Sequence, residues 1–382
     1  MSERASVPKE DEPDADADEA EAEPDEIQTG ADAVAAALET AGVDYLFGVQ
    51  GGAIMPVYDA LYEHEEMTHV TMAHEQGAAH AADAYGIVAG EPGVCMATSG
   101  PGATNLVTGI ADANMDSDPL IALTGQVPTD LVGNDAFQET DTIGVTQPVT
   151  KQNTFAESPH EVGNDVGEAW ALANEGRQGP TLVDLPKDVT QTETDSEPSE
   201  PTTPNTYNPP EEADDVVVAE AAKTLEAAER PLILAGGGVI KGEASDELRQ
   251  FAREYEIPVV QTMPGTGAFP DDDPLSLEIA GMHGTGYGNL AISNCDVLVG
   301  IGTRFDDRLT GGIDSFAPDA EVIHVDIDPA EISKNVFADY PLVGDAKQVI
   351  RQLDDELEEA PDAAEWREQC QTWKDEYPLD YE

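Results

Sequence analysis

Glu75 is the residue of this 382-residue chain whose type and setting best suit proton chemistry. It follows His74 and precedes a Gln-Gly-Ala-Ala stretch, where an expected strand gives way to an expected helix. A carboxyl group in such a place is only partly solvated, and desolvation makes it a suitable proton donor or hydrogen-bond partner. The alternative is a first-turn glutamate that only interacts with the helix dipole. His74 and His80 are six residues apart, so the segment lacks the i, i+4 histidine pair of a zinc-binding helix, and we expect no metal ligands in it.

Four loops of small and polar residues are expected around this carboxyl group. They are residues 50–52, 74–77, 99–105 and 125–128, and each follows a short apolar run typical of a strand. Open α/β sheets bind ligands beyond the carboxyl ends of their strands, so four such loops in order predict a composite crevice. Each glycine taken singly is also consistent with a simple tight turn.

The elements that would hold these loops alternate along the chain. Strands are expected at 45–49, 69–73, 94–98, 120–124 and 181–185. Helices are expected at 53–63, at 75–89, from Ala103 onwards, and between the N-cap Thr29 and the stop at Gly42. This alternation with apolar strands predicts a parallel sheet covered by helices on both faces.

A second unit of the same kind follows residues 190–215, which contain five prolines and predict an extended linker. Further strands are expected at 232–235, 258–262, 297–301 and 322–327, with helices at 216–228 and 245–255. We therefore expect an α/β protein with two doubly wound parallel-sheet domains, at 27–189 and 216–350. Residues 1–26 are expected to form a disordered acidic tail, and residues 351–382 to begin a linker into a domain that this chain lacks.

The second domain carries a possible phosphate-binding loop. The segment 236–238 is Gly-Gly-Gly after an expected strand, and the backbone N–H groups of such a loop can cradle a pyrophosphate. Lys241 stands where a G-x-G-x-x-G pattern needs its last glycine, so a nicotinamide Rossmann domain is not expected. Arg304, Asp306 and Arg308 lie just after another strand and could bind phosphate and ribose groups, or form a surface ion-pair network.

The charge of the chain excludes several classes of partner. Lys and Arg number 17 against 79 Asp and Glu, which gives a net charge of −62. Such a field repels nucleic acid and anionic membranes, and its spread along the chain predicts a surface adapted to high salt, as in a halophilic archaeon. Three isolated cysteines predict neither disulfides nor a zinc site, and no apolar run is long enough for a membrane span, so we expect a cytoplasmic protein.

The motifs, in order, resemble one family. They are VQGGAIMPVYDAL, HEQGAAHAADAYG, TSGPGATNLVTGIADANMDS, LTGQVP, DAFQETD, GPTLVDLPKDV, LAGGGVI, GMHGTGYGN, GTRFDDRLTGG and VIHVDIDPAEISKN. From about residue 27 to 348 the chain resembles the catalytic large subunit of acetolactate synthase, a three-domain enzyme that depends on thiamine diphosphate. DAFQE, GMHG and RFDDR are specific to it within the wider family. The resemblance implies a first domain that binds the aminopyrimidine of thiamine diphosphate and a central domain that binds FAD.

The resemblance also implies an activity and partners. The enzyme decarboxylates pyruvate on thiamine diphosphate and joins the two-carbon unit to a second 2-oxo acid. Pyruvate as that acceptor gives 2-acetolactate, and 2-oxobutyrate gives 2-aceto-2-hydroxybutyrate, both precursors of branched-chain amino acids. Family members are homodimers or tetramers and bind a small regulatory subunit. They hold Mg²⁺ and the diphosphate through a third domain, so we expect this chain alone to be inactive.

Individual roles carry over to matching positions. Glu75 would hydrogen-bond the pyrimidine, Gly52 and Gln138 would stabilise oxyanions, and Phe137 and Lys187 would line the substrate channel, with Lys187 attracting the carboxylate. Gly51, Pro101 and Asn105 would lie near the thiamine. The FAD site, with the flavin in a structural role, would comprise Arg177, Gly236, Gly237, Gly238, Thr262, Met263, Met282, His283, Gly302, Arg304, Asp306, Arg308, Asp326, Ile327 and Asp345.

Two departures affect the expected substrate access: Gln50 stands where the family usually has Pro, and Thr129 and Asp130 stand where it often has basic residues. Two alternatives remain open at this point. One is a related thiamine-diphosphate decarboxylase or oxidase, and the other is a non-catalytic flavin-binding or interaction protein.

Overall fold

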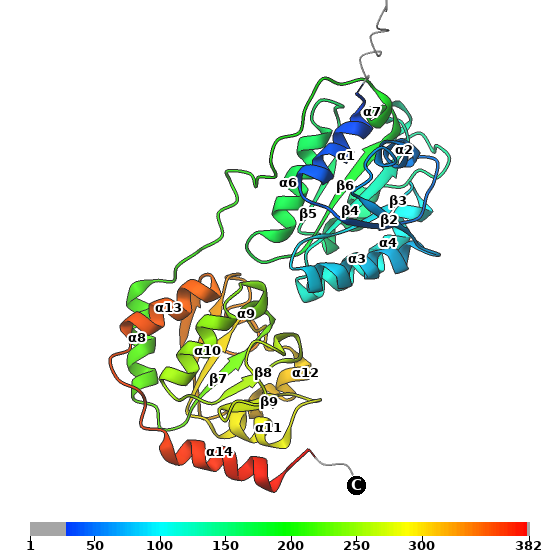
Figure 1. Ribbon diagram of the computed structural model, residues 1–382. Helices are drawn as coiled ribbons and strands as arrows, with labels where there is room; N and C mark the ends of the chain where they lie inside the picture. The colour runs from blue at the N-terminus through cyan, green and yellow to red at the C-terminus, as the bar shows by residue number, and fades with distance from the viewer. Residues whose placement is uncertain (1–27, 380–382) are drawn as a thin grey trace, which may run out of the picture.

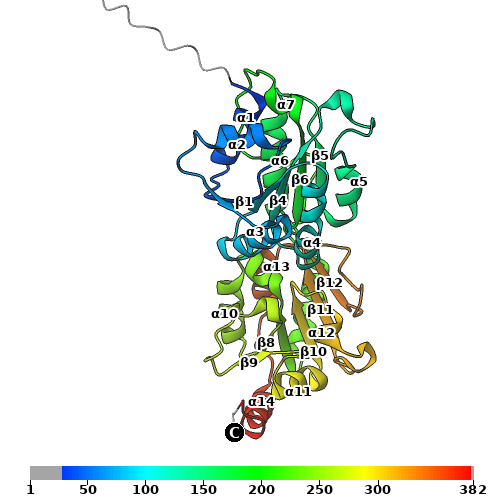
Figure 2. The ribbon, with the colours of Figure 1, turned by 90° about the vertical axis from the view of Figure 1, so that its right-hand side faces the viewer.

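The computed structural model describes residues 28–379, so the expected tail at 1–26 lies outside the described residues. Two α/β domains follow one another along the chain and are joined by a long extended segment (Figure 1). Each domain is built on a six-stranded, fully parallel sheet with helices on both faces (Figure 2). The predicted fold class is therefore confirmed.

The first domain contains the helices and strands up to residue 191. Its strands are β1 (Tyr45–Gly48), β2 (Thr68–Thr71), β3 (Gly93–Ala97), β4 (Leu120–Gln126), β5 (Gln152–Phe155) and β6 (Pro180–Pro186), in the order β2-β1-β3-β4-β6-β5. Its helices are α1 (Gly30–Thr40), α2 (Met55–Leu61), α3 (Glu75–Ala89), α4 (Pro101–Asp116), α5 (Thr142–Thr146), α6 (Val162–Asn174) and α7 (Lys187–Gln191). Short 3₁₀ turns lie at Thr129–Leu131 and Gln147–Val149.

Local sequence signals explain the core of this domain. Thr29 and Asp32 form a reciprocal capping box at the start of α1, as the spacing predicts. Every residue of β3, β4 and β6 is buried, because helices cover both faces of these central strands. Separate apolar clusters lie on the two faces of the sheet.

The second domain repeats this architecture. Its strands are β7 (Pro231–Ala235), β8 (Val259–Gln261), β9 (Ser276–Ile279), β10 (Val297–Ile301), β11 (Glu321–Asp326) and β12 (Tyr340–Val343), in the order β12-β11-β10-β7-β8-β9. Its helices are α8 (Asp215–Glu226), α9 (Gly237–Lys241), α10 (Ser245–Glu254), α11 (Gly286–Asn294), α12 (Asp307–Thr310), α13 (Ala346–Glu356) and α14 (Ala364–Glu376), with 3₁₀ turns at Met263–Gly265 and Ile313–Ser315.

Each sheet has a switch point where the connections from two neighbouring strands leave in opposite directions, and this is where α/β sheets bind ligands. In the first domain the chain leaves β1 toward β2 on one side and later adds β3 on the other. In the second domain the same reversal separates β7 from β10. Glycine loops predicted from the sequence follow the strands on either side of the two switch points, which are β1 and β3 in the first domain and β7 and β10 in the second.

The end of the described chain differs from the expected linker. The boundary placed at residue 350 falls inside α13, and α14 packs Trp366 and Cys370 into the core of the second domain. Trp366 also donates its indole N–H to the carbonyl of Pro231 at 2.9 Å. The expectation of a linker from 351 was wrong here, because the apolar spacing of Ala363, Trp366, Cys370 and Trp373 builds a helix face that the polar composition hides.

Between α7 and α8 the chain has no named helix or strand and crosses from one domain to the other (Figure 1). Among the described residues, no helix combines the length and apolar character needed to cross a membrane.

Candidate cofactor sites

The first site is the crevice at the carboxyl ends of β1 to β4. Glu75 is the first residue of α3, partly buried, and His74 caps this helix by accepting a hydrogen bond from the backbone N–H of Gln76. Asn105, on α4, donates its side-chain amide to Glu75 Oε2 at 3.0 Å. The structure thus brings together two residues that lie 30 positions apart in the sequence.

Glycines bring the switch-point loops of the first domain close together. A side chain at Gly51 would place its Cβ 2.4 Å from Thr98 Cβ, and Thr98 Oγ1 accepts from the backbone N–H of Ala53 at 3.2 Å. A Cβ at Gly52 would meet nothing within 4 Å, so the space on this side of the residue is open. Pro101, at the start of α4, is exposed at the same edge.

The segment around Gln138 lies against the Gly100 turn. Gly100 has a φ of +55°, and a Cβ there would lie 2.4 Å from the carbonyl oxygen of Gln138. Glu139 fixes this segment because its carboxylate accepts from the backbone N–H groups of Gly133 and Ala136, and these bonds lower the pKa of Glu139. Phe137 is 87% exposed and projects from the segment.

A buried carboxyl group that the sequence analysis did not identify supports this edge. Asp184, in β6, accepts hydrogen bonds from Thr124 Oγ1 at 2.7 Å and from Gln126 Nε2 at 2.9 Å. Gln126 also donates to the carbonyl of Thr140, which ties the Gln138 segment to the sheet. Burial raises the pKa of Asp184 to about 6. Lys187 follows β6 and begins α7 at this same edge.

The second site is a cavity of about 680 Å³ at the carboxyl ends of the strands of the second domain. Nearly all residues predicted for the FAD site line it: Arg177, Gly237, Gly238, Thr262, Met263, Met282, His283, Gly302, Arg304, Asp306, Arg308, Asp326, Ile327 and Asp345. Gly236 lies directly behind this lining. The first domain closes the cavity with residues from the amino ends of its strands, among them Ser117 and Arg177.

Three glycines let two loops beside this cavity approach each other closely. A Cβ at Gly236 would lie 2.0 Å from the carbonyl oxygen of Gly302, and one at Gly238 would lie 2.6 Å from Gly302 Cα. Gly302 itself has a φ of +58°, which favours glycine. The loops after β7 and β10 can therefore meet at the switch point only if all three positions lack a side chain.

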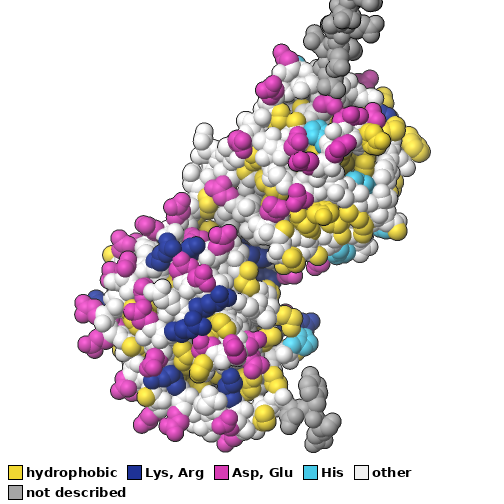
Figure 3. Space-filling model, viewed as in Figure 1, with side chains coloured by type: hydrophobic (Ala, Val, Ile, Leu, Met, Phe, Trp, Pro, Cys, Tyr) yellow, Lys and Arg dark blue, Asp and Glu magenta, His cyan; other side chains and the backbone are white. Residues whose placement is uncertain are grey.

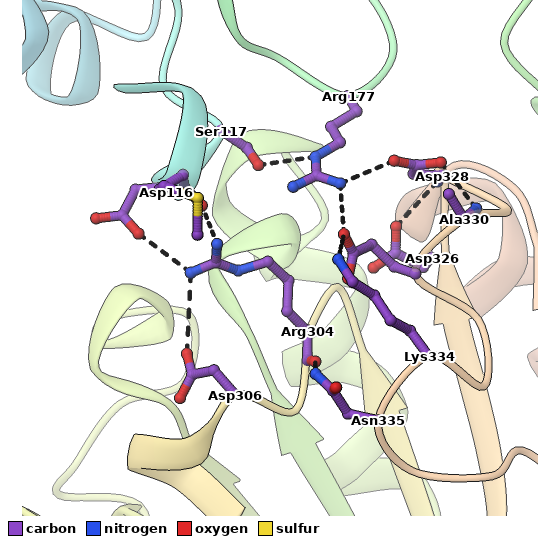
Figure 4. Close-up of polar contacts among 12 residues, drawn as sticks. Asp116, Ser117, Arg177, Arg304, Asp306, Asp326, Asp328, Ala330, Lys334 and Asn335 are labelled. Atoms are coloured by element: carbon purple, nitrogen blue, oxygen red, sulfur yellow. Dashed lines mark hydrogen bonds and ion pairs between the residues drawn. The ribbon is translucent and has the colours of Figure 1, made fainter. Parts of the chain in front are cut away.

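Charged side chains from both domains surround the cavity (Figure 4). Arg177 pairs with Asp328 at 2.8 Å and with Glu331 at 2.7 Å, and its Nε donates to Ser117 Oγ at 2.9 Å. Arg304 crosses the domain boundary to Asp116 at 3.1 Å. These contacts hold the two domains together around the cavity.

Lys241, at the end of α9, makes a similar contact. Its Nζ donates to Asp118 Oδ1 at 2.6 Å and to the carbonyl of Ser117 at 2.9 Å. The sequence analysis treated Lys241 only as a departure from a glycine motif and missed Asp116, Ser117 and Glu331 altogether. The scarcity of basic residues is a signal that could have drawn attention to Lys241, because each one in such an acidic chain needs an explanation.

Two acidic side chains of the cavity, Asp326 and Glu331, could form hydrogen bonds with a ligand. Burial raises the pKa of Asp326 to about 6. Glu331 is only 4% exposed, and its Oε2 has no hydrogen-bond partner. Burial alone would raise the pKa of Glu331, but hydrogen bonds from Lys334 and Arg177 outweigh it and lower the pKa.

Comparison with known proteins identifies both domains. Residues 28–145 match the model for the thiamine pyrophosphate enzyme N-terminal TPP binding domain, and residues 218–353 match the central domain of the same enzymes. The chain belongs to the thiamine pyrophosphate enzymes.

Within this class the similar proteins share one name. A probable acetolactate synthase large subunit of Methanocaldococcus jannaschii is 53% identical over 328 residues, which cover 85% of this chain and 55% of that protein. The acetolactate synthase large subunit of Parasynechococcus marenigrum is 48% identical over 359 residues, covering 92% and 58%. That of Corynebacterium glutamicum is 47% identical over 362 residues, covering 94% and 58%. The chain is thus homologous to acetolactate synthase large subunits, and it spans little more than half of their length.

Proposed function

We propose that this chain supplies the pyrimidine-binding and flavin-binding domains of an acetolactate synthase. In the proposed reaction pyruvate loses CO₂, and the remaining two-carbon unit is joined to a second pyruvate or to 2-oxobutyrate. The hydrogen bond between Asn105 and Glu75 at the ligand-binding edge of the first sheet is the observation that carries this proposal. Its relatives, which are about 50% identical, support the particular reaction.

Glu75 has the geometry needed to act on the pyrimidine ring. Thiamine diphosphate, when bound, supplies the electron sink for decarboxylation and carbon–carbon bond formation. Asn105 binds Oε2 of Glu75, which leaves Oε1 free and fixes its direction. Oε1 is directed toward Gly102, where a Cβ would lie only 3.6 Å away. In our proposal Glu75 holds a proton at Oε1 and shares it with the ring nitrogen.

The substrate would be held by groups at the same edge. The space beside Gly52 is open where a side chain would stand, so a substrate can come close to its backbone N–H, which would donate to a developing oxyanion with help from the side chain of Gln138. Lys187 supplies positive charge for the carboxylate of a 2-oxo acid, and exposed Phe137 would line the approach. Gly51 and Pro101 would shape the wall beside the thiamine.

FAD fits the cavity between the domains. Its volume lies within the range of small-molecule and cofactor sites, and its glycine base lets a diphosphate approach the backbone closely. Arg304 and Arg308 supply positive charge, while Asp326 and the unpaired Oε2 of Glu331 can accept hydrogen bonds from ribose hydroxyls. The proposed reaction has no net redox step, so we propose a structural role for the flavin.

Other features of the whole enzyme remain part of the proposal. We expect Mg²⁺ and the diphosphate to be bound by the part of the relatives' length that this chain does not span. We also propose a homodimer or tetramer, a small regulatory subunit, a cytoplasmic location and a surface adapted to high salt. The last rests on the net charge of −62.

The test is product analysis with pyruvate, using the protein joined to its diphosphate-binding domain, at KCl concentrations from about 0.1 M to molar. We expect 2-acetolactate, with activity and melting temperature both rising with KCl as self-repulsion is screened. Acetaldehyde or acetyl phosphate as the main product would instead indicate a related decarboxylase or oxidase. Equal stability at all KCl concentrations would contradict the high-salt adaptation alone.

A further inference from the structure

Three potential metal ligands meet between two helices of the first domain. His80 and Asp83 lie on α3, and Asp112 lies on α4. Each offers one ligand atom, and these atoms all lie within 4.8 Å of one another. His80 Nδ1 is 3.4 Å from Asp112 Oδ2.

Close packing of the two helices holds this cluster in place. Gly109 of α4 faces Ala79 of α3 so closely that a Cβ at Gly109 would lie 2.5 Å from Ala79 Cβ. His80 follows Ala79 directly, and Asp83 is three residues further along, on the same face of the helix. Asp112 is three residues beyond Gly109. The contact between Gly109 and Ala79 therefore sets the distance between Asp112 on α4 and the two ligands on α3.

Asp83 is the member of the cluster that requires an explanation. It is only 8% exposed, and its Oδ1 has no hydrogen-bond partner. The neighbouring acidic side chains of Asp118, Asp112 and Asp116 add negative charge around it, and the side chain of Asp118 also makes a hydrogen-bond contact with Asp83. The two cations that reach this region are engaged by other residues of it, Lys241 by Asp118 and Arg304 by Asp116. A buried carboxylate oxygen without a partner, next to other acidic groups, is costly unless a proton or a cation neutralises it.

We propose that His80, Asp83 and Asp112 bind a divalent transition-metal cation such as Zn²⁺ or Mn²⁺. One imidazole nitrogen and two carboxylate oxygens form a donor set that suits these ions. Ligands about 2.1 Å from a tetrahedral Zn²⁺ are about 3.4 Å apart, which the pair of His80 and Asp112 already matches. Asp112 is exposed, so the ion can enter from solvent and keep water in its remaining positions.

The bound ion would clamp α3 to α4. These helices carry Glu75 and Asn105 at their other ends, and Asp112 lies two turns beyond Asn105 on α4. The site is therefore separate from the proposed Mg²⁺–diphosphate site and does not depend on the activity of the enzyme. The expectation of no metal ligands in this segment rested on the spacing of His74 and His80. That spacing gave no information on Asp112, because Asp112 lies near His80 only where α3 and α4 pack together.

The experiment titrates the chelator-treated 382-residue chain with Zn²⁺ alone, by calorimetry in molar KCl, which suppresses loose binding to the acidic surface. We expect one saturable site per chain. H80A and D112N should weaken it by at least 100-fold, and D112N changes an exposed residue that is not needed for folding. Mn²⁺ bound to the wild-type chain should give an immobilised electron paramagnetic resonance spectrum that D83N removes.

His64 provides a matched control. Its Nδ1 lies 3.1 Å from Glu39 Oε2, so it forms the same kind of His–carboxylate pair, but it is not part of the three-ligand cluster. H64A should bind Zn²⁺ as the wild type does. The proposal is overturned if the wild-type chain has no stoichiometric site, or if H80A and D112N bind as tightly as H64A.

Discussion

The two cofactor sites differ in how they use positive charge. Residues 28–191 contain three basic side chains: Lys151, Arg177 and Lys187. Lys151 and Arg177 precede β5 and β6, so Lys187 alone lies at the carboxyl edge of the first sheet. The cavity between the domains, in contrast, has Arg177, Lys241, Arg304 and Arg308 along its walls.

The surface shows the same division. In the view of Figure 3, acidic side chains are spread over both domains, whereas most of the visible basic side chains lie on the central domain. The difference indicates two kinds of ligand contact. The first site offers a directed carboxyl group and a single cation, which suits proton chemistry on a neutral ring, and the second offers several cations, which suits a diphosphate.

The sharpest test of this comparison is to remove the proton-holding group of the first site. E75Q should lower the rate of acetolactate formation by roughly 1,000-fold, because an amide cannot share the proton in the same way. FAD binding, measured by flavin fluorescence, should stay unchanged because the cavity is separate. E65Q, which changes an exposed glutamate on the loop before β2, is the control and should retain full activity. Near-normal turnover of E75Q would remove Glu75 from the mechanism.

Much of this fold was predictable from the sequence. The buried strands β3, β4, β7, β10 and β11 are apolar runs between turn signals, and α3 begins and ends where predicted. The strands β5, β9 and β12 were missed because they lie at or near sheet edges, where partly exposed residues such as Gln152 and Asn153 break the apolar pattern.

The sites were predictable to different depths. The glycine loops mark the carboxyl ends of strands, and so they indicate both crevices without knowledge of the fold. Contacts between elements that are far apart in the sequence could not be predicted in this way. The ion pairs of Arg177 with Asp328 and of Lys241 with Asp118 depend on how the two domains are arranged. The local sequence pattern contains no information on that arrangement.

A second test concerns the single cation of the first site. K187Q should raise the KM for pyruvate by roughly 10- to 100-fold, because a charge-assisted contact to the carboxylate is lost. The kcat should change much less, since Lys187 is proposed to attract substrate and not to transfer a proton. K223Q, an exposed position on α8, serves as the control in steady-state kinetics. An unchanged KM would show that another group recognises the carboxylate.

The smallest expected effect is a pH dependence of FAD affinity that arises from the ionisation of Asp326. Burial raises the pKa of Asp326 to about 6, and in the proposed FAD site ribose hydroxyls would donate to its ionised form. FAD affinity should therefore fall by up to about tenfold as the pH is lowered from 7 to 5, and D326N should bind more weakly without this pH dependence. Titrations of FAD at several pH values check this, with D314N as an exposed control. A wild-type affinity that is constant over this range would exclude the ribose contact.

The ionisation of Asp326 should affect folding stability in the opposite direction, since stability should fall as the pH rises. Its pKa in the folded, ligand-free chain lies above the ordinary value of 3.8, so the unfolded chain releases its proton first. The contribution of Asp326 to the free energy of unfolding should consequently decline as the pH rises from about 4 to about 6. D326N would remove that part of the decline.

The meeting of Gly236, Gly238 and Gly302 has a consequence for selectivity. Because these glycine positions carry no side chains, this part of the cavity can respond to the shape and negative charge of a ligand but cannot tell one nucleotide base or ring system from another. Discrimination must come from the side chains above it, such as Met263, Met282 and His283. An attempt to redesign the ligand preference of the proposed FAD site should therefore vary those three positions and leave the glycines untouched.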